Sequence, residues 1–155
     1  MASPTPSSTR SEPSMIPAAA TVLLPVRDAG RFLEPALASL ERQSRRDFVV
    51  LAVDDGSLDG SASVLHAWIP ARLPGRVLAT GGDGITAALI HAAEFARTPY
   101  WIRMDADDIA EPARWERQAA WMEAHPEVVA AGCALWRIDD EGDRIGTYDP
   151  PTDPA

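Results

Sequence analysis

The ten residues FVVLAVDDGS, numbered 48–57, decide the fold class of this 155-residue chain. The first six are apolar without a break, whereas a strand with one solvated face alternates apolar and polar side chains. A short unbroken apolar run is typical of a strand that is covered on both faces, as in a parallel sheet between layers of helices. The acidic and small residues that follow predict a turn at the carboxyl end of this strand.

Similar apolar runs and helical patterns alternate on both sides of this segment. Further strands are expected at residues 21–24, 76–79, 100–104 and 128–136. Apolar residues at helical spacing predict helices near residues 33–40, 64–68, 85–96 and 112–124. Strands that are separated by helices form βαβ units, so we expect an α/β protein with a mostly parallel sheet flanked by helices.

The two ends of the chain differ in composition from its middle. Seven of the fourteen prolines lie in residues 1–17 and 150–155. We therefore expect a disordered leader at residues 1–17, an ordered domain at residues 18–147 and a disordered tail at residues 148–155. The leader lacks the hydrophobic segment of a secretory signal, and the single cysteine excludes an internal disulfide. These features favour a cytoplasmic protein.

Charge is distributed unevenly along the sequence. The net charge is −9, and residues 105–155 contain thirteen acidic but only four basic residues, whereas residues 1–104 are balanced. A basic footprint for nucleic acid is therefore absent, and no nucleic-acid partner is expected. Concentrated carboxylates suit a divalent cation, although a solvated acidic surface has the same composition.

Acidic residues follow three of the expected strands. Ligands of open parallel sheets bind outside the carboxyl ends of the strands, where Asp28, Asp55 and the segment 105–108 are expected to lie. A cation would relieve the repulsion between Asp105 and Asp107, and hard oxygen ligands suit Mg²⁺ or Mn²⁺. Taken alone, the Asp-x-Asp tripeptide also fits a solvated turn before a helix. Its position at a strand end favours the metal.

Three loop segments carry further hypotheses. Of Asp54 and Asp55, one is expected to form the turn, and the other could accept a hydrogen bond from a nucleobase. The glycine-rich residues 81–84 predict a flexible turn, with a loop beside the substrate as the alternative, and they match neither a Walker loop nor a dinucleotide fingerprint. The acidic run 139–143 predicts a hairpin turn.

Taken together, these motifs resemble the family 2 glycosyltransferases, nucleotide-sugar enzymes with the Rossmann-like GT-A fold. The resemblance extends from about residue 20 to residue 140. The motifs occur in family order, as LLPVRD at 23–28, VDDGS at 53–57, AAL at 87–89, RMDADD at 103–108 and HPE at 125–127. Each motif is weak by itself, and the ordered set is specific.

The resemblance implies a site and a reaction. The donor would be a nucleotide-diphosphate sugar, with a UDP-sugar as the first expectation, bound through Mn²⁺ or Mg²⁺. Its substrate-binding residues would be Pro25, Val26, Arg27, Asp55 and Asp105, and its metal ligands Asp107 and Asp105. Members of the family invert the anomeric carbon of the sugar while a carboxylate base activates the acceptor hydroxyl.

The sequence also departs from the family pattern. Arg27 and Asp28 stand where the family often has Tyr and Asn, and Ile90 stands where it often has Asn. The chain stops soon after the expected fifth strand, and in the family the acceptor-binding half and the catalytic base follow that point. The catalytic base is therefore unknown, and we do not expect this short chain alone to transfer sugar efficiently.

A non-catalytic fragment or module that binds nucleotides stays open as the alternative. An aspartyl phosphohydrolase is disfavoured because its Asp-x-Asp follows the first strand, and a nicotinamide dehydrogenase because the glycine fingerprint is absent. The acceptor would be a saccharide or a lipid-linked sugar, by analogy only. Peripheral association with the inner face of the membrane is left open.

Overall fold

The computed structural model of this protein describes residues 18–150. The chain forms two compact units, one up to Pro112 and one from Ala113 onward. The leader predicted at residues 1–17 lies outside the described residues, as do residues 151–155 of the predicted tail.

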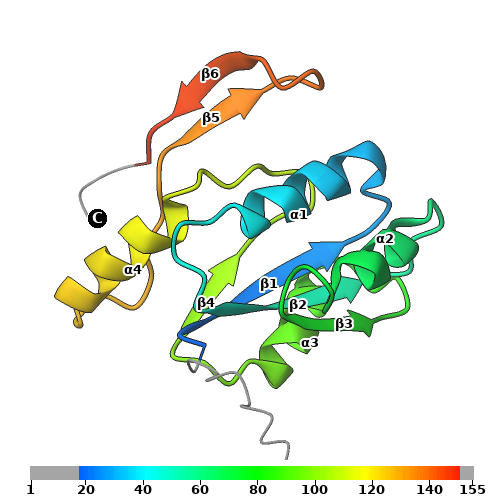
Figure 1. Cartoon of the computed structure of the whole chain (residues 1–155), viewed down its shortest axis with the longest axis horizontal. Helices are drawn as coiled ribbons and strands as arrows, with labels where there is room; N and C mark the ends of the chain where they lie inside the picture. Colours follow the sequence, from blue (N-terminus) through cyan, green and yellow to red (C-terminus); the bar gives the residue numbers. More distant parts are fainter. Residues whose placement is uncertain (1–17, 151–155) are drawn as a thin grey trace, which may run out of the picture. The chain divides into compact units, whose positions relative to one another are not determined.

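The first unit contains a four-stranded parallel sheet in the order β3-β2-β1-β4 (Figure 1). Its strands are β1 (Ala20–Val26), β2 (Phe48–Asp54), β3 (Gly75–Ala79) and β4 (Tyr100–Arg103). All seven residues of β1 are buried, and β2 is buried except for two half-exposed positions. The unbroken apolar runs therefore belong to the two central strands, and these four strands were predicted correctly from the sequence.

Helices cover both faces of this sheet. They are α1 (Leu33–Glu41), α2 (Ser61–Trp68) and α3 (Ile85–Phe95), with a short 3₁₀ helix, η1 (Gly30–Phe32), before α1. Right-handed crossovers place α1 and α2 on one face of the sheet and α3 on the other. This arrangement confirms the predicted α/β architecture with a parallel sheet between helices.

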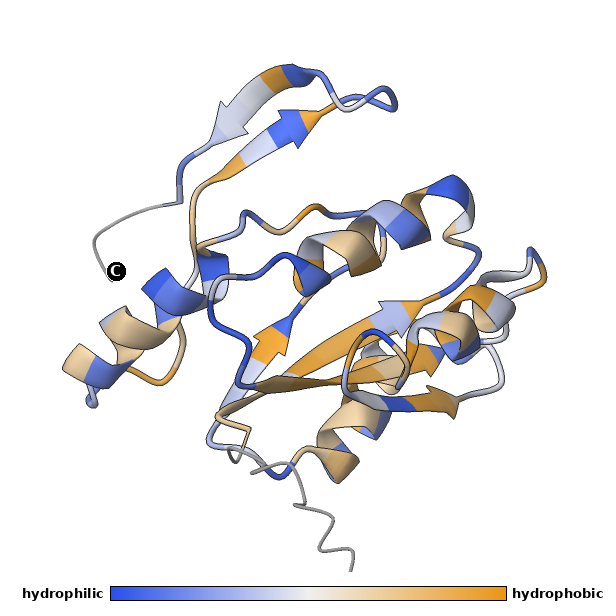
Figure 2. Ribbon diagram, viewed as in Figure 1, coloured by the Kyte–Doolittle hydropathy of each residue, from blue (hydrophilic) through white to orange (hydrophobic). Residues whose placement is uncertain are grey.

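The core lies on both sides of β1 and β2, which Figure 2 shows as mostly hydrophobic ribbons. On one side, strand side chains pack against small residues of α3 and the residue after it; this cluster contains Leu23, Leu51, Val53, Ala88, Ala92 and Ala96. The leucines Leu24, Leu37 and Leu65 are fully buried. Burying each such side chain stabilises the fold by about 1.5–3 kcal/mol.

The second unit consists of α4 (Arg114–Ala124) and an antiparallel hairpin of β5 (Leu135–Ile138) and β6 (Arg144–Tyr148). The Asp139 carboxylate accepts hydrogen bonds from the backbone N–H groups of Glu141 (3.1 Å) and Asp143 (2.8 Å). The acidic run 139–143 is therefore the predicted hairpin turn. Strand β6 reaches Tyr148, one residue beyond the expected end of the ordered domain.

The start of the predicted fifth strand is wrong. Residues 129–134 form neither helix nor strand, and Val129 is 97% exposed. The strand begins at Leu135 and pairs with β6. A short apolar run becomes a strand only where a partner strand supplies hydrogen bonds and side-chain contacts, and the local sequence does not encode that partner.

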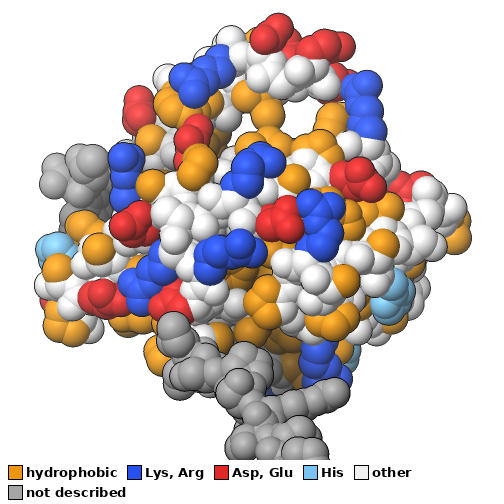
Figure 3. Space-filling model, viewed as in Figure 1, with side chains coloured by type: hydrophobic (Ala, Val, Ile, Leu, Met, Phe, Trp, Pro, Cys, Tyr) orange, Lys and Arg blue, Asp and Glu red, His pale blue; other side chains and the backbone are white. Residues whose placement is uncertain are grey.

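The surface of the described residues carries both signs of charge. On the face drawn in Figure 3, acidic and basic side chains are interspersed. No helix among residues 18–150 combines the length and the hydropathy that crossing a membrane would require.

Candidate functional site

The strand order creates a crevice at the carboxyl ends of β1 and β4. The chain proceeds from β1 to β2 and β3 in one direction, and β4 then returns to the other side of β1. Ligands of open α/β sheets bind at such a switch point. A pocket of about 430 Å³ opens here, within the range of small-molecule sites. It is lined by Pro25, Val26, Arg27, Asp28, Ala29, Phe32, Asp55, Gly84, Ile85, Ala106 and Asp107.

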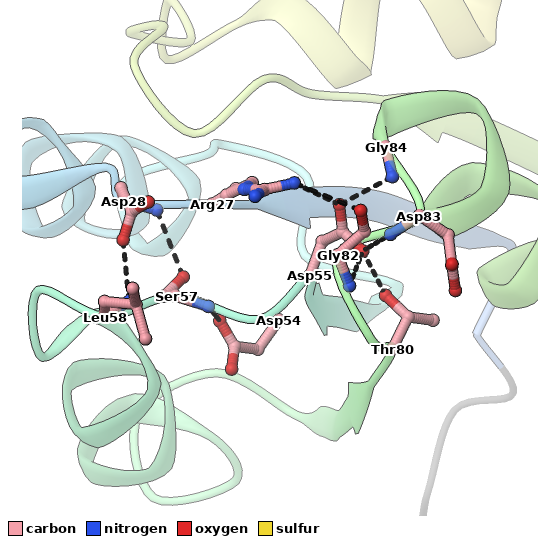
Figure 4. A network of polar contacts seen from close by, with 10 residues as sticks. All are labelled: Arg27, Asp28, Asp54, Asp55, Ser57, Leu58, Thr80, Gly82, Asp83 and Gly84. Atoms are coloured by element: carbon pink, nitrogen blue, oxygen red, sulfur yellow. Dashed lines mark hydrogen bonds and ion pairs between the residues drawn. The ribbon is translucent and has the colours of Figure 1, made fainter.

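The loop after β1 is held against the loop after β2 (Figure 4). The Asp28 N–H donates to the Ser57 hydroxyl (3.1 Å), and the Asp28 carboxylate accepts the N–H of Leu58 (2.7 Å). Asp28 has a φ of 47°, a left-handed conformation that Asp tolerates because its short side chain can form local hydrogen bonds. The Gly30 N–H donates to Asp59 (2.7 Å). These cross-links fix one wall of the pocket.

Asp54 and Asp55 take different roles, as the sequence suggested. The Asp54 carboxylate accepts the N–H of Ser57 at 3.2 Å, which closes the turn after β2. Asp55 points into the protein and is only 2% exposed, yet its side chain reaches the pocket lining. Asp54 is thus the turn residue, and Asp55 is the acid at the crevice.

The Asp55 carboxylate is held by four hydrogen bonds, which we call the Asp55 latch. Oδ1 accepts the Thr80 hydroxyl (2.6 Å) and the N–H groups of Gly82 (3.0 Å) and Asp83 (2.9 Å). Oδ2 accepts the N–H of Gly84 at 2.8 Å. Figure 4 shows the loop wrapping around the carboxylate. Oδ2 therefore keeps more of its accepting capacity than Oδ1.

The glycines make this wrapping possible. Gly82 and Gly84 have φ values of 91° and 93°, which cost a residue with a side chain far more than they cost glycine. Backbone N–H groups that converge in this way form a concavity that attracts an anion, and Asp55 fills it. Three hydrogen bonds to Asp55 fix the segment and Gly84 lines the pocket, so residues 81–84 form an anchored loop at the pocket.

The latch also changes the acidity of Asp55. The hydrogen bond from the Thr80 hydroxyl lowers the pKa of Asp55, and those from Gly84, Asp83 and Gly82 lower it further. Burial acts in the opposite direction and is outweighed. A carboxylate whose charged form accepts several hydrogen bonds is stabilised in that form, so Asp55 carries its charge at neutral pH.

Arg27 lies over the latch at the pocket wall. Its Nη1 donates to the Gly82 carbonyl at 3.2 Å and lies 3.7 Å from Oδ2 of Asp55. The side chain is 55% exposed, so the guanidinium is anchored at one end and open to the pocket at the other. A Cβ added to Gly82 would lie 3.5 Å from the same Nη1. The guanidinium therefore packs directly on this glycine.

The acids after β4 divide into two environments. Asp105 accepts two hydrogen bonds of 3.0 Å from Nε and Nη2 of Arg103, and it is not part of the pocket lining. Asp107 is exposed and lines the pocket, and within residues 18–150 its carboxylate has neither a hydrogen bond nor an ion pair. The structure thus brings Asp107 and Asp55 to one pocket and leaves Asp105 outside it.

The donor set available to a metal is small. No group of three His, Cys, Asp or Glu side chains that could hold an ion exists in the described part of the chain. The pocket lining carries three carboxylates, from Asp28, Asp55 and Asp107, and the guanidinium of Arg27. The N-terminus of α3 reaches the same pocket at Ile85, and helix N-termini attract negative groups.

Sequence reasoning missed Phe32 as a pocket residue. Phe32 ends η1, is half-buried and lines the pocket. Its signal in the sequence is its position: it directly precedes Leu33, which starts the buried stripe of α1, and follows the loop of a strand end. An aromatic residue at the edge of such a stripe and next to a ligand-binding loop is a candidate contact.

Comparisons with known proteins identify a family that this chain matches. The family model described as "Glycosyl transferase family 2" matches residues 21–151. The amylovoran biosynthesis glycosyltransferase AmsE of Erwinia amylovora is 33% identical over 111 residues, covering 71% of this chain and 42% of AmsE. The putative glycosyltransferase EpsE of Bacillus subtilis is 26% identical, covering 80% of this chain and 45% of EpsE. The chain thus spans less than half the length of these relatives.

Two solved structures show the same fold. A mannosyltransferase from Pyrobaculum calidifontis, in complex with GDP-Man and Mn²⁺, aligns with a TM-score of 0.69 and 26% identity, over 79% of this chain and 36% of that one. A structure of residues 1–349 of S. aureus TarS aligns with a TM-score of 0.64 and 22% identity, over 69% of this chain and 33% of that fragment. These likenesses confirm the GT-A fold that the sequence predicted.

Proposed function

The chain belongs to glycosyl transferase family 2, and on that premise we propose that its pocket binds a nucleotide-diphosphate sugar together with Mn²⁺ or Mg²⁺. The observation that carries the proposal is Asp107, an unpartnered carboxylate in a negatively charged pocket at the switch point of the sheet. The Pyrobaculum calidifontis neighbour in complex with GDP-Man and Mn²⁺ supports it. A UDP-sugar is the first donor to test and a GDP-sugar the second.

The residues present fit such a cation. The lining has an excess of carboxylates, so a diphosphate would be repelled without a positive ion. Mg²⁺ is usually bound through one or two carboxylates plus substrate phosphates, and this pattern needs no cage of protein ligands. Asp107 would be the main ligand. Asp105 would join it, or contact the ribose, after its ion pair with Arg103 opens.

The nucleobase would occupy the part of the pocket formed by the end of β1. Pro25 and Val26 would contact it, and Oδ2 of Asp55, which accepts one hydrogen bond, would face its edge. Phe32 offers an aromatic surface, and aromatic side chains bind bases by stacking. The Arg27 guanidinium offers a second flat surface.

The reaction proposed for the complete protein is an inverting transfer. The bond between the anomeric carbon and the diphosphate oxygen breaks as the acceptor hydroxyl oxygen bonds to that carbon, and the hydroxyl proton passes to a base. The bound cation would neutralise charge on the leaving diphosphate. We assign no base within residues 18–150. The acceptor would be a saccharide or a lipid-linked sugar, and AmsE by its name acts in amylovoran biosynthesis.

Titration calorimetry tests the donor proposal. UDP and GDP are titrated into the chain with Mn²⁺ and again with EDTA, and uridine and guanosine serve as controls without phosphates. We expect binding of at least one diphosphate that falls at least tenfold in EDTA, because the pocket repels the uncompensated anion. The nucleosides should show no such metal dependence. Equal diphosphate affinity in both conditions, or no binding at all, would contradict the proposal.

A further inference from the structure

Thr80 is absent from the pocket lining, yet it touches the residue that organises the pocket. We propose that Thr80 is a positioning residue for donor binding: acting through Asp55 and the 81–84 loop, it fixes Arg27 in the pocket wall. The inference rests on the proposed function and deepens it, because it assigns a role to a residue outside the site. Three links in the structure connect Thr80 to the pocket.

The first link joins Thr80 to Asp55. Thr80 directly follows β3, and its N–H donates to the Asp54 carbonyl at 3.0 Å, so its backbone is tied to the end of β2. Its hydroxyl makes the shortest hydrogen bond of the Asp55 latch, 2.6 Å to Oδ1. A β-branched side chain has few χ1 rotamers, so this donor is well directed.

The second link joins Asp55 to the loop. Three consecutive N–H groups, from Gly82 to Gly84, donate to the same carboxylate. A segment with three glycines among four residues loses much conformational entropy when it is ordered, so it needs a partner that offsets this cost. If Thr80 no longer directs the carboxylate, the loop has a weaker anchor.

The third link joins the loop to Arg27. The Gly82 carbonyl accepts the hydrogen bond of Nη1, and the guanidinium packs on this glycine. An exposed Arg side chain has many rotamers, so the ligand would otherwise have to select one. Held in this way, the guanidinium presents a flat surface to a nucleobase at a position where the family often has Tyr.

Matched variants at Thr80 test the proposal. Thr80→Val keeps the shape but removes the donor, and Thr80→Ser keeps the donor but removes the methyl group. Losing one hydrogen bond to a buried charged group weakens the arrangement, and we expect about a fivefold loss of diphosphate affinity in Thr80→Val. Thr80→Ser should stay within about twofold of wild type. Thr80→Ala is the second variant without a hydroxyl and should match Thr80→Val.

Two further readouts separate positioning from a general loss of structure. Amide hydrogen exchange by NMR should be faster at Gly82, Asp83 and Gly84 in Thr80→Val and unchanged at Val50 in the centre of β2. In a double-mutant cycle with Arg27→Ala, the affinity cost of Thr80→Val should largely disappear, because the side chain through which Thr80 acts is gone.

The outcomes distinguish the two proposals. Wild-type affinity in Thr80→Val, or the same cost with and without the Arg27 side chain, would overturn the role of Thr80 while leaving donor binding intact. Faster exchange throughout β2 would assign Thr80 a structural role only. A wild-type chain that binds neither UDP nor GDP would overturn the proposed function itself, and the exchange data would still show whether Thr80 orders the loop.

Discussion

The ends of β2 and β4 each carry two or more aspartates, and one from each end, Asp55 and Asp107, lines the same pocket in a different environment. At the end of β2, Asp55 is 2% exposed and accepts four hydrogen bonds from the loop after β3. At the end of β4, Asp107 is exposed and has no partner within residues 18–150. One carboxylate is satisfied by the protein before any ligand arrives, and the other is not.

This difference suggests that two residues of the same type have different roles in the pocket. A carboxylate that already accepts four hydrogen bonds stabilises its own loop, and in Asp55 only Oδ2, which accepts one of them, keeps capacity for a further donor. A carboxylate without partners keeps its full capacity for a cation. We therefore propose that Asp55 mainly holds the loop that shapes the pocket, with Oδ2 left to face the base, and that Asp107 is the metal ligand.

Asp107→Asn should have the largest effect on ligand binding. An amide keeps the size of the side chain but loses the charge that a divalent cation needs, so we expect metal-dependent diphosphate affinity to fall on the order of 100-fold. Asp108→Asn is the matched control, because Asp108 is also exposed and lies outside the pocket lining. Calorimetry with Mn²⁺ measures both. A larger loss for the control would place the cation elsewhere.

Phe32→Ala should have an intermediate effect. Base stacking on an aromatic side chain contributes about 1–3 kcal/mol, so diphosphate affinity should fall roughly tenfold without a change in metal dependence. Phe95→Ala is the control, since Phe95 is a partly exposed aromatic residue of α3 outside the pocket lining. Fluorescence or calorimetric titration of the two variants decides the matter. Equal affinities would show that Phe32 does not contact the base.

The smallest expected effect is on the stability of the protein at acidic pH. The latch lowers the pKa of Asp55, so its contribution to stability is complete above the unfolded value of about 3.8 and is lost as the pH falls through the lower folded value. Asp55→Asn lacks this carboxylate. The difference in unfolding free energy between wild type and variant should therefore shrink as the pH falls below about 4. Urea unfolding from pH 6 to pH 3 measures it, and a constant difference would contradict the latch.

Sequence patterns predicted the centre of the sheet because its two central strands, β1 and β2, are buried on both faces. As a strand, the apolar run at residues 48–53 buries all its side chains only where both faces are covered. Strand β2 occupies such a central position. The apolar residues 128–131 carried the same local signal without a partner strand, and they form no strand. Whether a four-residue apolar run forms a buried strand depends on a partner strand elsewhere in the chain, so the run by itself does not predict it.

The position of the candidate site was predictable from the sequence, whereas its hydrogen bonds and ion pairs were less so. The rule that ligands bind at the carboxyl ends of strands located Asp55 and Asp107. The latch depends on the positive φ values of Gly82 and Gly84 and on Thr80, which is 25 residues from Asp55 along the chain. The pairing of Asp105 with Arg103 spans two residues, but it competes with the metal role that the resemblance implied. The hydrogen-bond partners of Asp55 and Asp105 therefore become known only from the three-dimensional structure.

The position of a bound manganese ion tests the comparison most directly. Crystals of the chain grown with Mn²⁺ and the diphosphate that binds in calorimetry would be measured at a wavelength where manganese scatters anomalously. We predict a single strong peak within coordination distance of the Asp107 carboxylate and of the diphosphate, with all four hydrogen bonds of the Asp55 latch intact. A peak at Asp55, with its loop hydrogen bonds broken, would contradict the account.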